Sequence, residues 1–158
     1  MRAPLSPNKH VHAEQYVANF FRSNGWSVEM QQEDSLSADL LIRHGKHRFI
    51  VEIKALSEGR PDRVLPVLSM AILQAKAAAE LSGNALPLAI IFVPEASLSL
   101  AKHVEVFAQK FAKDVPVGVI SGRGEQYFSG EAFQQLNRLP EEPSRSSTGR
   151  LSQAINLF

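Results

Sequence analysis

Two short apolar runs separated by a polar tip form the clearest pattern in the chain. Leu40–Ile42 and Phe49–Val51 flank the polar tip His44–His47, which is the pattern of a β-hairpin. The central pair Gly45-Lys46 suits a two-residue type II′ loop, which takes glycine at its first position. We therefore expect His44 to face His47 across the hairpin.

This hairpin register brings three charged residues together. It pairs Asp39 with Glu52, and because side chains alternate along a strand, Glu52 and Lys54 share one face. Facing carboxylates repel each other, so a divalent cation is expected between them, and oxygen ligands favour Mg²⁺ or Mn²⁺. Lys54 would then hold or deprotonate an attacking water. The alternative is an exposed strand face on which Glu52 and Lys54 form a surface pair.

The remaining pattern predicts an α/β sandwich with a mixed sheet. Pro66 fits the second helix only within its first turn, and the apolar run 86–93 reads as a strand buried on both faces. The predicted elements are a helix from about 8 or 10 to 24, a strand at 26–30, the hairpin, a helix at 63–82, the strand 86–93, a helix at 98–113, a strand at 115–120 and a short helix near 133–139.

Composition narrows the class of protein. The 158 residues, 44% of them hydrophobic, fit one soluble globular domain with a net charge of +1. The absence of cysteine excludes disulfides, thiolate metal sites and cysteine nucleophiles. Met1–Lys9 lacks the apolar core of a signal peptide and no run approaches transmembrane length, so we expect a cytoplasmic protein without a membrane partner. Walker-type loops and Gly-x-Ser-x-Gly motifs are absent.

Basic residues gather around the hairpin and the loop after it. Such a patch near a metal would attract a phosphate backbone, and the alternative is charge that protects an edge strand. The histidines show no metal-ligand spacing and are expected at the surface. The predicted nucleic-acid-binding residues are Arg43, Lys46, Arg48, Arg60 and Arg63.

Asp39 followed by Glu52-Ile53-Lys54 resembles the signature of the PD-(D/E)xK nuclease superfamily, whose members have the restriction-endonuclease-like fold. Ala38 stands where that family usually has proline. The resemblance covers about residues 10–94 and implies an α-β-β-β-α-β core, a mixed sheet flanked by helices.

The resemblance also implies roles for individual residues. Asp39 and Glu52 would hold Mg²⁺ (or Mn²⁺) with the Ile53 carbonyl, and Lys54 would activate the nucleophile. Glu14 in the first helix would support the metal cluster, and Gln74 in the second would position Lys54 or the phosphate. Both Glu14 and Gln74 have solvated helical side chains as the alternative.

These features predict a metal-dependent phosphodiesterase, specifically a DNA endonuclease of DNA repair, recombination or defence. The alternatives are a non-catalytic nucleic-acid-binding or assembly module of the same fold, and a nuclease subunit that cuts only within a larger complex. A homodimer is expected because cutting both strands of a duplex needs two sites.

The chain divides into a nuclease-like domain, residues 1–139, and a C-terminal segment, residues 140–158. Residues 140–150 have no aliphatic or aromatic side chain and predict a flexible linker. The apolar residues Ile155, Leu157 and Phe158 resemble peptides that bind the bacterial sliding clamp, although Ala154 occupies the expected glutamine position. The alternative is that these three residues pack on their own domain or on a second copy.

Overall fold

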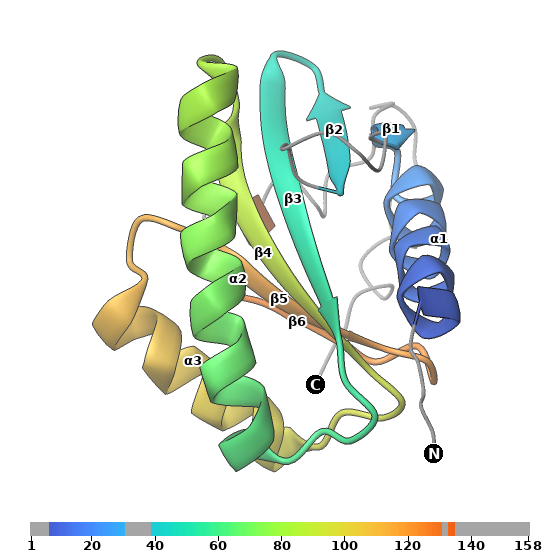
Figure 1. The fold of residues 1–158 in the computed structure, drawn as a ribbon, viewed down its shortest axis with the longest axis vertical. Coiled ribbons are helices and arrows are strands. Elements are labelled where there is room, and N and C mark those ends of the chain that lie inside the picture. The colour runs from blue at the N-terminus through green and yellow to red at the C-terminus, as the bar shows by residue number, and fades with distance from the viewer. Residues whose placement is uncertain (1–6, 31–38, 131–132, 135–158) are drawn as a thin grey trace, which may run out of the picture.

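A six-stranded sheet with helices on both faces forms the described part of the protein (Figure 1). The computed structural model describes residues 7–30, 39–130 and 133–134. The described elements, in order, are α1 (Pro7–Ser23), β1 (Ser27–Met30), β2 (Leu40–His44), β3 (His47–Ala55), α2 (Pro61–Ser82), β4 (Leu86–Val93), α3 (Leu98–Phe111), β5 (Val117–Ser121) and β6 (Gln126–Phe128).

The strands lie in the sheet in their sequence order. β1, β2 and β3 form an antiparallel meander, β4 and β5 continue the sheet in parallel with β3, and β6 returns antiparallel to β5. Parallel neighbours need long crossover connections, and α2 and α3 supply them. The predicted α/β class, the mixed sheet and the α-β-β-β-α-β order are confirmed.

The hairpin register is also as predicted over the paired residues. His44 faces His47 and Leu40 faces Val51. Gly45 has a φ of +64°, the left-handed conformation that primed hairpin turns require at their first central residue.

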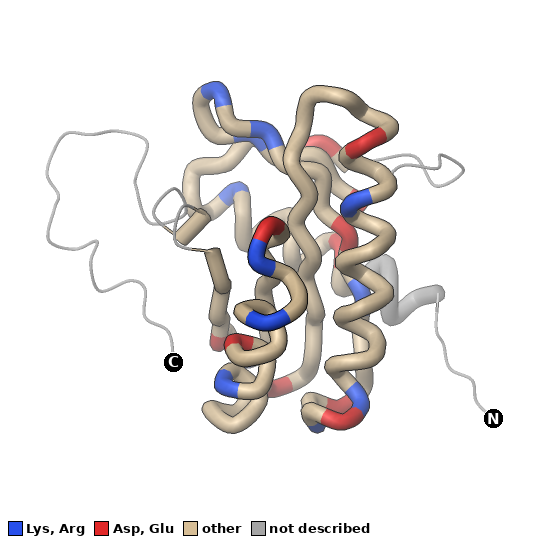
Figure 2. Tube along the Cα trace, turned by 90° about the vertical axis from the view of Figure 1, so that its left-hand side faces the viewer, with Lys and Arg blue, Asp and Glu red and all other residues tan. Residues whose placement is uncertain are grey.

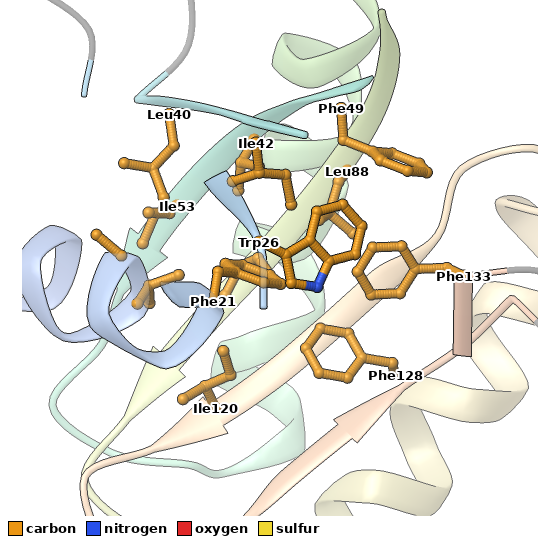
Figure 3. Packing of buried hydrophobic residues seen from close by; sticks show 14 of the residues in the cluster. Phe21, Trp26, Leu40, Ile42, Phe49, Ile53, Leu88, Ile120, Phe128 and Phe133 are labelled. Atoms are coloured by element: carbon orange, nitrogen blue, oxygen red, sulfur yellow. The ribbon is translucent and has the colours of Figure 1, made fainter. Parts of the chain in front are cut away.

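Alternate residues of the strands pack into separate cores on the two faces of the sheet. α1 covers one face, where Phe21 and Trp26 meet Phe49, Phe128 and Phe133 in an aromatic cluster (Figure 3). Trp26 stacks on Phe133 with ring centroids 5.5 Å apart. α2 and α3 cover the other face, over residues such as Ala89 and Ile91. In β3, Phe49, Val51 and Ile53 face α1, and the residues that alternate with them, such as Ile50, face α2.

α2 begins two residues earlier than predicted. Pro61 occupies its first turn, where no N–H is needed, and Pro66 is its sixth residue. The prediction that Pro66 lies in the first turn was wrong. Burial of Val64 and Leu68 on either side of Pro66 offsets the backbone hydrogen bond that Pro66 cannot donate.

α2 also has apolar residues on its exposed side. By length and composition it could cross a membrane, contrary to the expectation that no run approaches transmembrane length. Its buried face packs on the sheet, as a core helix does, and Met70, Leu73 and Leu81 on the other side are 50–72% exposed.

Several smaller predictions differ from the structure. β6 was not foreseen, because three residues after Gly124 give too short a pattern. His44 is not a surface residue: its ring lies 5.1 Å from that of Trp26. The short helix near 133–139 is described only at 133–134, and the predicted linker and clamp-binding residues lie outside the described residues.

Candidate active site

Glu52 and Lys54 lie side by side on the face of β3 that α2 partly covers. Lys54 Nζ is 3.6 Å from Glu52 Oε2, and the side chains are 28% and 14% exposed, respectively. Their neighbour Ile50 on the same face packs against Ala78 of α2. A partly buried ion pair of this kind loses hydration, which offsets part of the attraction between its charges.

Asp39 joins this pair in a different way from the one predicted. The ladder between β2 and β3 ends at Leu40 and Val51, one residue before the expected pairing of Asp39 with Glu52. The Asp39 N–H donates to the Val51 carbonyl over 2.9 Å, and Asp39 Oδ2 accepts from the Ile53 N–H over 2.8 Å. The Asp39 carboxylate thus accepts a hydrogen bond that a backbone carbonyl would accept in a regular ladder. The two partners of Asp39, Val51 and Ile53, are the residues on either side of Glu52.

The Ile53 carbonyl is oriented toward the same place. In an antiparallel pair the N–H and C=O of one residue point to the same neighbouring strand. Because the Ile53 N–H is directed to the β2 side, its carbonyl is also directed there. The Ile53 carbonyl is therefore directed to the side of β3 on which Asp39 lies, just before the first residue of β2.

This donor set fits a hard divalent cation. Mg²⁺ takes oxygen ligands, is commonly held by one or two carboxylates and retains several waters. No group of three or more acidic, histidine or cysteine side chains within the described ranges 7–30, 39–130 and 133–134 could hold a metal ion. Asp39, Glu52 and the Ile53 carbonyl are the groups that would hold such an ion.

Gln74 is exposed on α2, one helical turn before Ala78, which packs against Ile50 of β3. Residues four apart share a helix side. Four helical residues rise about 6 Å, and the two strand residues from Ile50 to Glu52 rise about 6.6 Å. Since α2 runs antiparallel to β3, these rises predict that Gln74 is near the level of Glu52, and its role stays a prediction.

Glu14 belongs to the helix on the opposite face. α1 packs through Ala13 and Val17 against the core that includes Val51 and Ile53, whereas Glu52 and Lys54 point away from that core. Glu14 is half-buried. Its predicted support of the metal cluster stays a prediction.

The basic residues are arranged unevenly around the site. Arg60 is already paired with Glu58 and Asp62, while Arg63 is exposed in the first turn of α2. The other three basic residues belong to the β2–β3 hairpin, whose basic segments lie together at the top of Figure 2. In that hairpin Arg43 lies directly opposite Arg48, and Lys46 is at the tip.

Ser27 is a neighbour of this hairpin that sequence reasoning missed. Ser27 of β1 lies opposite Arg43 of β2, which lies opposite Arg48 of β3. These three residues form one row across the three strands. The long polar connection 31–38 gave no register for β1, and only the alternation of Trp26–Met30 could have placed Ser27 on this face.

Comparison with known proteins gives little direct guidance. The chain matches no family model and no curated protein. Among solved structures it is similar to Hjc, a Holliday junction resolvase from the archaeal hyperthermophile Archaeoglobus fulgidus, with 12% identity, a TM-score of 0.34, and 77% of this chain and 75% of that chain covered. A TM-score this low does not transfer the activity of Hjc to this chain.

Proposed function

We propose that this protein is a metal-dependent phosphodiesterase that cleaves DNA as an endonuclease. One observation carries the proposal: just before β2 begins, Asp39 accepts a hydrogen bond from the amide of Ile53, the residue between Glu52 and Lys54, whose charged groups are 3.6 Å apart. This is an oxygen-ligand set beside a group that can hold a water.

Each residue has a distinct role in this proposal. Asp39, Glu52 and the Ile53 carbonyl would hold Mg²⁺ or Mn²⁺, which supplies charge stabilisation for the phosphoryl oxygens and lowers the pKa of a bound water. The hydrogen bond from the Ile53 N–H fixes the position of the Asp39 carboxylate beside Glu52. Lys54 would orient the attacking water, and Gln74 of α2 would orient the phosphate.

The basic residues support a polyanionic substrate. Arg43, Lys46 and Arg48 lie at one end of the hairpin and Arg63 at the start of α2. These cations would neutralise phosphates of the substrate, and they would raise the affinity for nucleic acid in a salt-dependent manner.

Cleavage of defined nucleic acids tests the proposal. The purified protein is incubated with Mg²⁺ or Mn²⁺ and labelled duplex DNA, four-way junction DNA, single-stranded DNA and RNA, with Glu52→Gln as the matched control. We expect cleavage by the wild type and none by Glu52→Gln. Equal cleavage by both proteins would contradict the site, and binding without cleavage would favour a non-catalytic module.

A further inference from the structure

A row of polar side chains crosses three strands at the hairpin end of the sheet. Ser27 of β1 is opposite Arg43 of β2, which is opposite Arg48 of β3. Side chains alternate along a strand, so this row shares its face with Leu41 and Ile50, which pack beside α2. It therefore lies on the same face as Glu52 and Lys54.

The row places two like charges directly opposite each other. Facing like charges in a sheet are destabilising, and acidic neighbours usually offset them. No ion pair involving Arg43 or Arg48 is found among the described residues. The next row toward the site contains one acid, Glu29, which is exposed on the edge strand β1 and faces Leu41.

Arg48 also has hydrogen-bonding capacity that the described part of the protein does not use. Its Nε is buried and has no hydrogen-bond partner there, although buried polar atoms are nearly always paired. Arg43 is exposed, so an anion can approach the pair from solvent. A phosphate would offset the repulsion and accept hydrogen bonds from the guanidinium groups, and a guanidinium fork matches phosphate geometry.

We propose that Ser27, Arg43 and Arg48 form a phosphate subsite that holds a non-scissile phosphate of the DNA strand being cut. This inference rests on the proposed function, because it treats Glu52 as the position of the scissile phosphate. Arg48 precedes Glu52 by four strand residues, which is about 13 Å along β3. The subsite therefore binds a different phosphate and fixes how the strand lies along the face.

Binding measurements without cleavage test this subsite. The affinity of the full-length protein for a labelled DNA duplex is measured against salt concentration in Ca²⁺, for wild type, Arg43→Gln, Arg48→Gln and the matched control Lys110→Gln on α3. Each phosphate contact contributes about 0.9 to the slope of log K against log salt. We expect each arginine variant to lose about one unit of slope and Lys110→Gln to lose none.

Single neutral methylphosphonate linkages then locate the phosphate. We expect the wild type to lose affinity at one linkage other than the scissile one, and Arg43→Gln to lose no further affinity there. Thermal melting verifies that the variants are folded, with Arg43→Lys as a variant that retains the charge.

The two proposals fail in different ways. Unchanged slopes in both arginine variants, with a wild type that binds and cuts DNA, would overturn the subsite and leave the nuclease intact. A wild type that neither binds nor cuts any nucleic acid would overturn both.

Discussion

The carboxylate of Asp39 accepts a hydrogen bond from the backbone N–H of Ile53 over 2.8 Å. This contact joins the N-terminal end of β2 to the C-terminal half of β3 at the point where the backbone ladder stops. Asp39 is therefore both a proposed metal ligand and a substitute for a strand carbonyl, and its two roles can be separated by mutation.

Asp39→Ala and Asp39→Asn should differ in stability but not in activity. Both remove a negative ligand and should abolish cleavage. Asp39→Ala leaves the Ile53 N–H without its acceptor, which costs about 1–3 kcal/mol where the group is buried, whereas the side-chain amide oxygen introduced by Asp39→Asn can still accept. Denaturant unfolding of the two variants measures the difference; equal stabilities would contradict the structural role of Asp39.

Lys54→Met should separate catalysis from metal binding. Lys54 neutralises Glu52 at 3.6 Å, so its removal leaves more negative charge for a cation. We expect cleavage to fall about 10²–10⁴-fold, the range of a lost acid–base group, while calorimetry shows Mg²⁺ affinity at least as high as in the wild type. Loss of Mg²⁺ binding in Lys54→Met would instead indicate a structural lysine.

Replacing the metal should uncouple binding from cutting. Ca²⁺ shares the oxygen ligands of Mg²⁺ but accepts a looser and larger coordination shell. Calorimetry should therefore detect Ca²⁺ in the wild type and not in Asp39→Ala, and nuclease assays should show little cleavage with Ca²⁺. Chelation with EDTA should abolish cleavage, and activity that survives it would rule out a metal-dependent mechanism.

Local sequence patterns predicted the fold. The features that were not predicted depend on contacts between elements that are distant in the sequence. The hairpin register followed from the turn and two apolar runs because both are local in sequence. The Asp39–Ile53 bond could not be foreseen, since it depends on where the ladder stops, and β1 could not be aligned across residues 31–38. The position of Glu14 likewise depends on which face α1 covers, which periodicity does not specify.

Gly118 is a residue whose identity depends on a contact between strands and not on the hydrophobic pattern of β5. A Cβ at this position would lie 2.6 Å from Cδ1 of Phe128 and 3.0 Å from Cδ1 of Ile90. Gly118→Ala should therefore displace β6 and cost about 1–3 kcal/mol, as overpacking does. Gly122→Ala, whose Cβ would have a nearest contact of 3.5 Å, is the control, and thermal or denaturant unfolding measures both. Equal stability of the two variants would contradict tight packing of Phe128 on β5.

Glu125 should make stability depend on pH. Its Oε1 accepts from the Ala96 N–H over 2.9 Å and from Ser121 Oγ over 2.7 Å, which ties the β5–β6 turn to the loop before α3. The hydrogen bond from Ala96, then that from Ser121, lowers the pKa of Glu125 below its usual 4.5, and nearby Arg123 adds to this against the opposing effect of burial.

The sign of this dependence follows from linkage. A carboxyl whose pKa is lower in the folded state binds protons more readily when unfolded, so its stabilisation is complete above the unfolded pKa of 4.5 and is lost as the pH falls through the lower folded value. Glu125→Gln lacks this titration. The melting temperature of the wild type should therefore exceed that of Glu125→Gln near pH 7, and the difference should shrink between about pH 5 and pH 3. Glu80→Gln, an exposed change on α2, is the control, and a difference that stayed constant down to pH 3 would show that the charge of Glu125 does not stabilise the turn.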